Sequence, residues 1–223
     1  MMLNQRYSGI KGIEDIANYT FHIFGCGAIG SSSAVQLVKM GAEIFYLYDM
    51  DKVEEVNIGV SMYDRRDLDK TKVDALKDHI LAVNPNCLIR TYNEKFNKYY
   101  HTGDNDVAIL GFDSMEARMQ VVTACTNRKE TTPLFLIDGR MGAEHYQQYL
   151  IKKPTTTKYA KIWYSDEEGS QEPCNRKATA YCSFVCGAFI TNTIRKVITG
   201  MPYQEEITFH FPDLSLAQKL RIQ

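Results

Sequence analysis

Three glycines at a fixed spacing constrain the fold of this chain more than any other feature. They are Gly25, Gly27 and Gly30 in the stretch GCGAIG, and they follow an apolar run at residues 21–24. Residues 28–40 then carry apolar side chains at helical spacing, so the sequence predicts a strand, a tight turn and a helix. Glycine in such a turn lets backbone amides approach a phosphate, which makes the turn a candidate nucleotide-binding site.

Strand and helix signals continue to alternate after this unit. Further strands are predicted at residues 43–49, 87–92, 106–112 and 133–138, and further helices from Lys70 and from Ser114, with Ser114 as N-cap. A chain built in this way forms a mostly parallel, doubly wound sheet with helices on both faces. We therefore predict an α/β fold with a Rossmann-like nucleotide-binding turn.

The last third of the chain has a different pattern. It contains two predicted strands at residues 146–153 and 158–164, an acidic loop, a long helix at residues 178–199 and a late strand from Glu205. We expect residues 1–150 to form the nucleotide-binding core. Residues 151–223 are expected to form a small α+β extension of the same domain.

Composition excludes several classes of protein. Apolar residues make up 44% of the chain and charged residues 24%, and the formal net charge is -1, which argues against a dedicated nucleic-acid binder. The longest apolar run, from Ala180, is interrupted by polar residues and does not predict a membrane span. We expect a soluble cytoplasmic chain without membrane partners, whose six cysteines are thiols.

Acidic residues follow the second predicted strand. Asp49 ends that strand, where a carboxylate can accept hydrogen bonds from ribose hydroxyls, and up to this point ATP and NAD are equally compatible with the site. Asp51 follows two residues later, ahead of Glu54 and Glu55. A solvated acidic loop is the alternative interpretation, and we favour it for the two glutamates.

The stretch DMDKVEEVNIGVSMYDRRDLDKTKVDAL, from Asp49, resembles the adenylation domains of the ubiquitin-activating-enzyme (E1) superfamily, which includes the ThiF and MoeB proteins. The family pattern runs approximately DxDxVxxSNLxRQ, then D(V/I)GxxK, then a strand that ends in DN. The resemblance extends from Arg6, Tyr7 and Ser8 to the strand that enters Gly139.

The resemblance implies ATP and Mg²⁺ as cofactors. It implies that Asp49 binds ribose, that Asp51 belongs to the cofactor site, and that Asn57 and Lys72 contact the triphosphate. It also implies that Asp113 holds Mg²⁺ or positions the phosphates. Adenylation also needs cations and a metal to neutralise charge as pyrophosphate leaves, whereas hydride transfer does not. Lys72 and Asp113 are therefore the discriminating pair, although Lys72 taken alone is an ordinary exposed helix lysine.

The sequence departs from the family pattern at two positions where the family has arginine. Val60 and Gly9 stand where the family has arginine, so that Arg65, Arg66 and Arg140 are candidates to replace them. We favour Arg140, because it follows a predicted strand at the end where open α/β sheets bind ligands. Pairing of Arg140 with Asp138 or Glu144 is the alternative. Arg118 matches the family arginine that follows the metal-binding aspartate, and an ordinary surface helix arginine is its alternative.

Three cysteines lie in the region where many relatives carry a zinc tetrad or a cysteine that forms a thioester. Cys182 and Cys186 are four residues apart on one helix face, but no fourth ligand is evident, so we expect buried thiols and not zinc. Cys174 lies beside Arg176 and Lys177 at the start of the long helix, where thiolate is favoured. Cys174 is thus a candidate acyl acceptor, with a plain exposed thiol as the alternative.

These features predict an adenylyltransferase that activates the C-terminal carboxylate of a small ubiquitin-like or sulfur-carrier protein, or of a peptide, ending in glycine. Acyl transfer to Cys174 would follow, and a homodimer is implied by the resemblance. Two alternatives stay open: a non-catalytic relative that binds a partner, in line with the arginines lost at Gly9 and Val60, and an NAD- or FAD-linked oxidoreductase that uses the same glycine turn.

Overall fold

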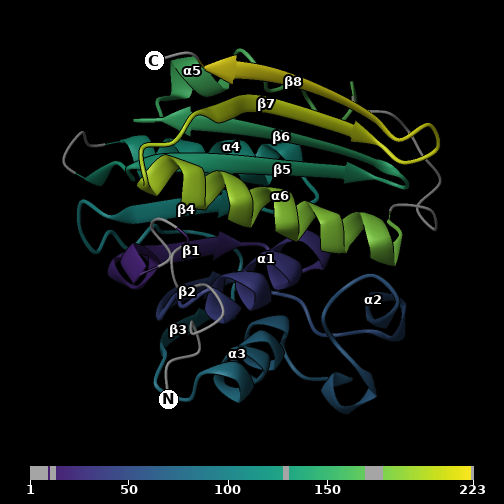
Figure 1. Cartoon of the computed structure of the whole chain (residues 1–223). Helices are drawn as coiled ribbons and strands as arrows, with labels where there is room; N and C mark the ends of the chain where they lie inside the picture. The colour runs from purple at the N-terminus through teal and green to yellow at the C-terminus, as the bar shows by residue number, and fades with distance from the viewer. Residues whose placement is uncertain (1–9, 11–13, 128–130, 169–177, 222–223) are drawn as a thin grey trace.

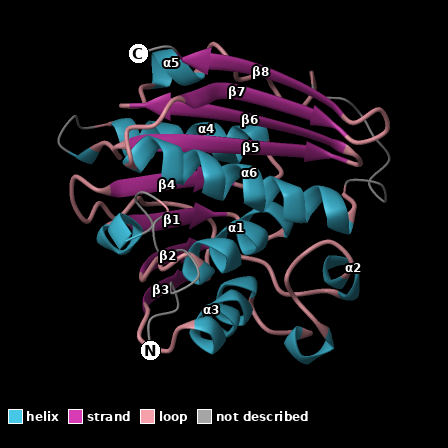
Figure 2. Cartoon of the chain, in the orientation of Figure 1, coloured by secondary structure: helices cyan, strands magenta, loops and turns pink. Residues whose placement is uncertain are grey.

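The alternation of strands and helices produces one eight-stranded sheet with helices on both faces (Figure 1, Figure 2). The structure is a computed structural model that describes residues 10, 14–127, 131–168 and 178–221. Its strands are β1 (Thr20–Phe24), β2 (Ile44–Tyr48), β3 (Leu88–Tyr92), β4 (Asp106–Leu110), β5 (Phe135–Gly142), β6 (His145–Lys152), β7 (Tyr203–His210) and β8 (Ser215–Arg221). Its α-helices are α1 (Ala28–Lys39), α2 (Glu55–Ile58), α3 (Lys72–Val83), α4 (Met115–Thr126), α5 (Thr156–Tyr159) and α6 (Ala180–Ile198), and the short 3₁₀ helices are η2 (Glu14–Asn18) and η3 (Arg65–Asp67).

The strand order in the sheet is β3-β2-β1-β4-β5-β6-β7-β8. Strands β1 to β5 pair in parallel, and β5 to β8 pair in antiparallel fashion. The predicted α/β class and the doubly wound core are confirmed. The C-terminal third continues the same sheet, and β6 crosses the predicted boundary after residue 150.

The parallel strands are buried on both faces, because each face supports its own core. In β4, Val107 and Ile109 point to one core and Ala108 and Leu110 to the other. The first core packs against α1, α3 and α6, and the second packs against α4 (Figure 1). This two-sided burial explains why the central strands carry continuous apolar runs.

Two predictions for the last third need correction. Residues 158–164 do not form a strand: Thr155 caps α5 by accepting the Lys158 N–H at 3.1 Å, and the chain then continues in turns. Strand β8, which the sequence analysis did not predict, forms by pairing with β7. No described helix combines the length and apolar character that crossing a lipid bilayer would need.

The topology brings three chain segments to one place. Strand β1 lies between β2 and β4, and the connections leaving β1 and β4 run to helices on opposite faces of the sheet. The C-terminal ends of these strands lead into the glycine turn, into Asp49 and into the turn that carries Asp113. Open α/β sheets bind ligands in the crevice at such a switch point.

Candidate functional site

The three glycines lie where β1 ends and α1 begins, and they meet different steric demands. Gly25 has a φ of +93°, and a Cβ there would lie 2.7 Å from the backbone of Gly111, in the turn after β4. A Cβ on Gly30 would lie 1.8 Å from the Gly25 carbonyl oxygen. A Cβ on Gly27 would meet nothing within 4 Å. Gly25 and Gly30 are therefore required by the packing of the chain on itself, whereas Gly27 borders open space.

The N-terminus of α1 is free of side-chain caps. Gly27 is the N-cap and provides no side-chain cap to the N–H groups of the first turn, and the first turn carries no acidic residue. The first backbone N–H groups of a helix have no partner within the helix, and the helix dipole makes this end positive. The end of α1 can therefore hold an anionic group such as a phosphate, in the open space beside Gly27.

The Asp49 carboxylate is buried and tied to the glycine turn. Its Oδ2 accepts a hydrogen bond from the Cys26 N–H at 2.7 Å, and its Oδ1 accepts one from the Asp51 N–H at 2.9 Å. Burial raises the pKa of Asp49 overall, although Lys72 and these two N–H groups oppose the rise. Each oxygen keeps a lone pair for one more donor, such as a ribose hydroxyl.

Lys72 is the first residue of α3, and its ammonium group lies among acidic side chains. Its Nζ is 2.7 Å from Asp51 Oδ2. The Lys72 side chain is only 12% exposed, whereas the Asp51 side chain is 55% exposed. Burial lowers the pKa of Lys72, but attraction to Asp49, Asp51 and Asp113 outweighs it and raises the pKa overall. Lys72 therefore carries a full positive charge at this edge of the sheet.

Asp113 lies in the exposed turn between β4 and α4. The next residue, Ser114, caps α4 by accepting the Ala117 N–H at 3.2 Å, as predicted. Asp113 is also one of the acidic residues whose attraction raises the pKa of Lys72, after Asp49 and Asp51. Among the described residues, none forms a hydrogen bond or an ion pair with the Asp113 carboxylate. A carboxylate without a protein partner suits Mg²⁺, which prefers oxygen ligands.

Two arginines share one buried carboxylate next to this turn. The Arg118 Nη1 donates to Asp138 Oδ1 and, at 2.8 Å, to the Gly139 carbonyl, and the Arg118 Nε donates to the Phe112 carbonyl at 2.8 Å. The Arg140 Nε and Nη2 donate to Asp138 Oδ2 at 2.9 and 2.6 Å. Arg118 thus connects the residue before Asp113 to β5.

The structure changes the interpretation of both arginines. Arg118 is 4% exposed, so it is not an ordinary surface arginine. Arg140 does not follow a strand but lies within β5, paired with Asp138 and with its guanidinium 4.8 Å from the Tyr149 ring and 5.1 Å from the Tyr164 ring. These contacts do not leave Arg140 free to bind phosphate, and the predicted alternative, pairing with Asp138, is the arrangement observed.

The other candidate replacements lie on the surface. The Arg65 side chain is 79% exposed and pairs with Glu55 at 3.4 Å, and the Arg66 side chain is 85% exposed and pairs with Asp64 at 2.5 Å. Both arginines belong to η3, in the loop that leads to α3. Exposed pairs of this kind are weak, so either arginine is available to an anionic ligand.

Asn57 has a local role in α2. Its Oδ1 accepts the Glu54 N–H at 2.9 Å, and its backbone carbonyl accepts a hydrogen bond from the Ser61 hydroxyl at 2.6 Å. These bonds cap the short helix and fix the start of the following loop. Contact of Asn57 with a triphosphate stays a prediction.

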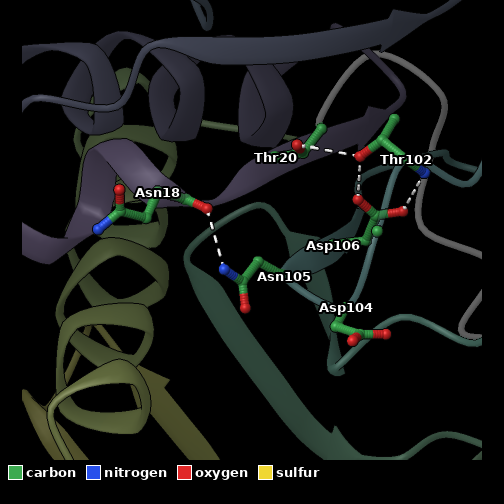
Figure 3. A pocket seen from close by; sticks show the side chains of 7 residues that line it. Asn18, Thr20, Thr102, Asp104, Asn105 and Asp106 are labelled. Carbon is green, nitrogen blue, oxygen red and sulfur yellow. Dashed lines mark hydrogen bonds between the residues drawn. The ribbon is translucent and has the colours of Figure 1, made fainter.

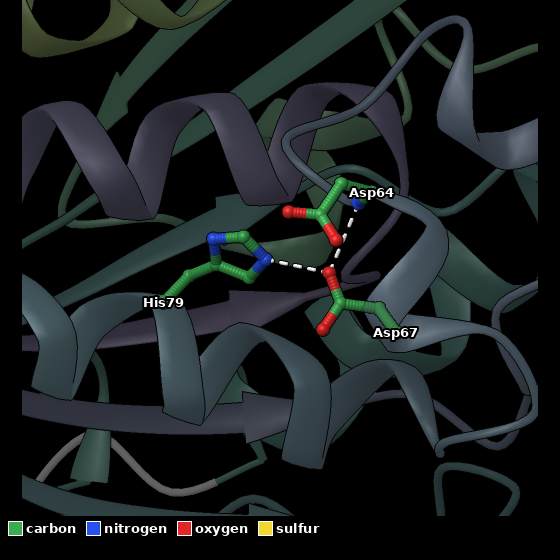
Figure 4. A group of neighbouring side chains, drawn as sticks. All are labelled: Asp64, Asp67 and His79. Carbon is green, nitrogen blue, oxygen red and sulfur yellow. Dashed lines mark hydrogen bonds and ion pairs between the residues drawn. The ribbon is translucent and has the colours of Figure 1, made fainter.

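Asp64, Asp67 and His79 offer ligand atoms that lie within 4.8 Å of one another, so this group of described residues could share a metal ion (Figure 4). All three side chains already have partners within the protein. His79 Nε2 lies 2.7 Å from Asp67 Oδ2, and the same oxygen accepts the Asp64 N–H at 3.0 Å. Asp64 also pairs with Arg66. We assign this cluster to anchoring the loop before α3.

Several predicted positions cannot be placed at the site. Cys174 lies outside the described residues, as does the N-terminal segment that contains Arg6 and Gly9. Cys182 and Cys186 lie on α6 and are buried, as predicted for apolar thiols. Acyl transfer to Cys174 therefore stays a prediction.

A separate polar cavity lies at the opposite ends of the strands, where β1 and β4 begin (Figure 3). Its volume is about 250 Å³, and it is lined by Asn18, Thr20, Thr102, Gly103, Asp104, Asn105 and Asp106. Asp106 is buried and accepts hydrogen bonds from the Tyr99 hydroxyl at 2.6 Å and the Thr102 N–H at 2.9 Å, with His22 Nε2 at 3.4 Å. Sequence analysis missed this cluster, because its members come from segments about 80 residues apart that only the sheet brings together.

Comparison with known proteins gives a family and a set of sequence relatives. Residues 2–221 match the family described as the ThiF family. Ubiquitin-like modifier-activating enzyme 5 of Caenorhabditis briggsae is 28% identical over 144 residues, and that of Bombyx mori is 30% identical over 139 residues. The alignments cover 58% and 56% of this chain but 33% and 35% of the relatives, so the chain spans about a third of their length.

Among solved structures, Escherichia coli MccB with ATP superposes with a TM-score of 0.72 over 93% of this chain and 65% of that chain, at 16% identity. MccB with AMPCPP and MccA gives a TM-score of 0.69, also at 16% identity. Similarity at this level of identity supports the fold alone. The α/β fold with its mostly parallel sheet is thus what the two proteins have in common.

Proposed function

Because the chain belongs to the ThiF family, we propose that it is an ATP- and Mg²⁺-dependent adenylyltransferase. It activates the C-terminal carboxylate of a small ubiquitin-like or sulfur-carrier protein, or of a peptide, that ends in glycine. One observation carries this proposal: Lys72, whose Nζ is 2.7 Å from Asp51, lies at the ends of the parallel strands that also carry Asp49, Asp113 and the uncapped end of α1. A cation, a free carboxylate and unpaired N–H groups are what a metal-bound triphosphate requires.

In the proposed reaction, a carboxylate oxygen of the substrate attacks the α-phosphorus of ATP. The bond from this phosphorus to its bridging oxygen breaks, pyrophosphate leaves, and an acyl adenylate is formed. The end of α1 and Lys72 stabilise the negative charge that develops on the phosphates. Mg²⁺ bound at Asp113 would neutralise part of the charge on the leaving pyrophosphate. Asp49 is proposed to bind the ribose hydroxyls, with Asp51 and Asn57 beside the phosphates.

The class of substrate is inferred from the relatives. The two sequence relatives are named ubiquitin-like modifier-activating enzymes, and MccB has been crystallised with ATP and with MccA. We propose a macromolecular carboxylate as the substrate on this basis. Homodimer formation and a cytoplasmic location stay predictions of the sequence analysis.

A non-catalytic partner-binding role is the second candidate function. Val60 stands where the family pattern has a phosphate-binding arginine, and Arg140 is held by Asp138. In such a protein ATP would bind at the glycine turn without release of pyrophosphate. Arg65 and Arg66 are the exposed arginines that could restore the missing charge.

ATP–pyrophosphate exchange tests the proposal and separates these two functions. We expect exchange in the presence of peptides or carrier proteins that end in glycine, and its loss in Lys72→Ala and in Asp113→Ala. Lys77→Ala, further along α3, and Asp104→Ala, at the opposite edge of the sheet, are matched controls that should keep the activity. ATP binding without exchange would favour the partner-binding role, and exchange retained in both site variants would overturn the assignment.

A further inference from the structure

One buried hydroxyl connects the two sides of the candidate nucleotide site. Tyr63 lies in the loop between α2 and α3 and is 3% exposed. Its hydroxyl lies 2.5 Å from the Cys26 carbonyl and 3.0 Å from the Lys72 carbonyl, as donor to both. A hydroxyl has a single proton, so the two carbonyl oxygens share one bifurcated hydrogen bond.

These two carbonyls belong to the segments that face the proposed phosphates. Cys26 lies within the glycine turn, directly before the N-cap of α1, and Lys72 begins α3. Each residue is also fixed through its backbone N–H: Cys26 donates to the Asp49 carboxylate at 2.7 Å, and Lys72 donates to the Asp51 carbonyl at 2.9 Å. Tyr63 adds the direct connection between the turn and the helix.

Tyr63 is itself held in place. Its N–H donates to the Ser61 hydroxyl at 3.3 Å, and the neighbouring Met62 N–H donates to the hydroxyl of Ser31, on α1, at 3.1 Å. The ring of His79, on α3, lies 6.1 Å from the Tyr63 ring. Burial raises the pKa of Tyr63 well above its usual value, so the hydroxyl keeps its proton and stays a donor.

We propose that Tyr63 is a positioning residue that sets the distance between the glycine turn and Lys72, and thereby the span of the triphosphate site. This inference rests on the proposed function of that site. Tyr63 does not contact the ligand; it acts through the two backbone segments that do. The ion pair between Lys72 and Asp51 alone cannot fix this distance, because the Asp51 side chain is more than half exposed.

The substitution Tyr63→Phe removes the hydroxyl and keeps the buried ring. We expect kcat/KM for pyrophosphate exchange to fall by about 10- to 100-fold, because small displacements of positioned groups are costly to the rate. We also expect weaker binding of Mg²⁺–ATP, measured by titration calorimetry. The decisive experiment is a double-mutant cycle on that binding: in a Lys72→Ala background, Tyr63→Phe should change the dissociation constant by no more than about twofold.

Tyr99→Phe is the matched control. Tyr99 is 8% exposed and donates its hydroxyl to Asp106 at the opposite ends of the strands, so the variant loses a buried hydrogen bond without touching the proposed site. It should lower the stability but leave the dissociation constant of Mg²⁺–ATP unchanged.

The possible results separate this proposal from the proposed function. If Lys72→Ala weakens nucleotide binding but Tyr63→Phe does not, or if Tyr63→Phe acts equally in both backgrounds, the positioning role is wrong and the nucleotide site stands. If the unmodified protein binds no nucleotide, or if Lys72→Ala has no effect, the proposed function fails and the positioning role with it.

Discussion

At the scale of single residues, two glycines of the turn are required by the fold, whereas the third borders the space proposed for a ligand. Gly25 and Gly30 are fixed by close contact of the chain with itself, with a left-handed backbone at Gly25. Gly27 has a φ of -76°, outside the left-handed region, and open space beside it. The glycine at position 27 therefore has no role in packing that the structure reveals.

Alanine substitutions test this separation. Gly30→Ala should lower the free energy of unfolding by about 2–3 kcal/mol, because the new methyl group would overlap the Gly25 carbonyl. Gly27→Ala should change it by less than about 0.5 kcal/mol, yet weaken ATP binding, because its methyl group enters the proposed phosphate space. Urea unfolding and titration calorimetry measure the two effects. Equal loss of stability in both variants would contradict this division.

The spacing of the glycines and the acid at Asp49 could be predicted, because they follow from local rules for a strand, a turn and a helix. The roles of Arg118 and Tyr63 could not. Their partners lie 20 residues away at Asp138 and 37 residues away at Cys26. A helix arginine and a loop tyrosine give no sign in sequence that tertiary packing will bury them.

At the scale of elements, β5 combines packing with charge. It pairs in parallel with β4 and in antiparallel fashion with β6, and it carries Asp138 between the arginine of α4 and its own Arg140. Tyr159 of α5 also donates its hydroxyl to Asp138, at 3.0 Å. This contact uses the last residue of α5, which lies within the segment 158–164 for which a strand was predicted, to complete the polar cluster.

Removing the Asp138 charge, which Arg118 and Arg140 share, should lower the stability of the fold. Asp138→Asn leaves two buried guanidinium groups without their anion, so we expect the free energy of unfolding to fall by about 3–5 kcal/mol. Glu55→Gln, which removes the partner of Arg65 in a pair whose side chains are 79% and 74% exposed, should cost less than about 1 kcal/mol. Urea unfolding of both variants decides the matter: similar losses would mean that the cluster is not the electrostatic anchor described.

The elements of the parallel core could be predicted because apolar runs mark strands that are buried on both faces. Strand β8 could not, because its described side chains, at residues 215–219, are all exposed and give no alternating pattern. It forms because β7 offers a free edge, which is a tertiary effect.

At the scale of the whole molecule, the two ends of the parallel strands have different tasks. One end carries the glycine turn, Lys72 and Asp113, and the other carries the buried pair His22 and Asp106. The second cluster holds the N-terminal ends of β1 and β4 together through hydrogen bonds among protein groups. It makes the stability of the fold dependent on pH.

Burial lowers the pKa of His22 in the folded chain. An unfolded histidine takes up a proton below pH about 6.5, whereas folded His22 does not, so the unfolded state gains protons and stability falls as the pH drops. The loss can reach about 1.4 kcal/mol per pH unit from this group. Below pH about 4, Asp106 adds to it. Burial raises the pKa of Asp106, but the nearby His22 ring and the hydrogen bonds from Thr102 and Tyr99 lower it by more.

Urea unfolding at pH 7.5, 6.5 and 5.5 measures this dependence. His22→Phe removes the titrating group, so the free energy of unfolding should vary less with pH in the variant than in the unmodified protein. His101, whose Nδ1 lies 3.0 Å from Asp106, also faces this carboxylate. An unchanged slope in His22→Phe would exclude His22 as the source.

The fold class and the family were within reach of the sequence because several ordered motifs point to the same sheet. The surroundings of Arg140 could not be predicted. The sequence pattern does not tell whether a strand ends at the edge where a ligand is expected or continues past it. The extension of β5 to Gly142 follows from its pairing with β6.

The unequal exposure of the Asp51–Lys72 pair has a consequence for how a ligand would enter. The lysine is enclosed by its surroundings, whereas the aspartate is open to water and can rotate away with its hydration restored. At the proposed nucleotide site, an incoming phosphate would therefore displace the Asp51 carboxylate and leave the Lys72 ammonium group in place. Until then, Asp51 would act as a removable counterion that keeps Lys72 aligned.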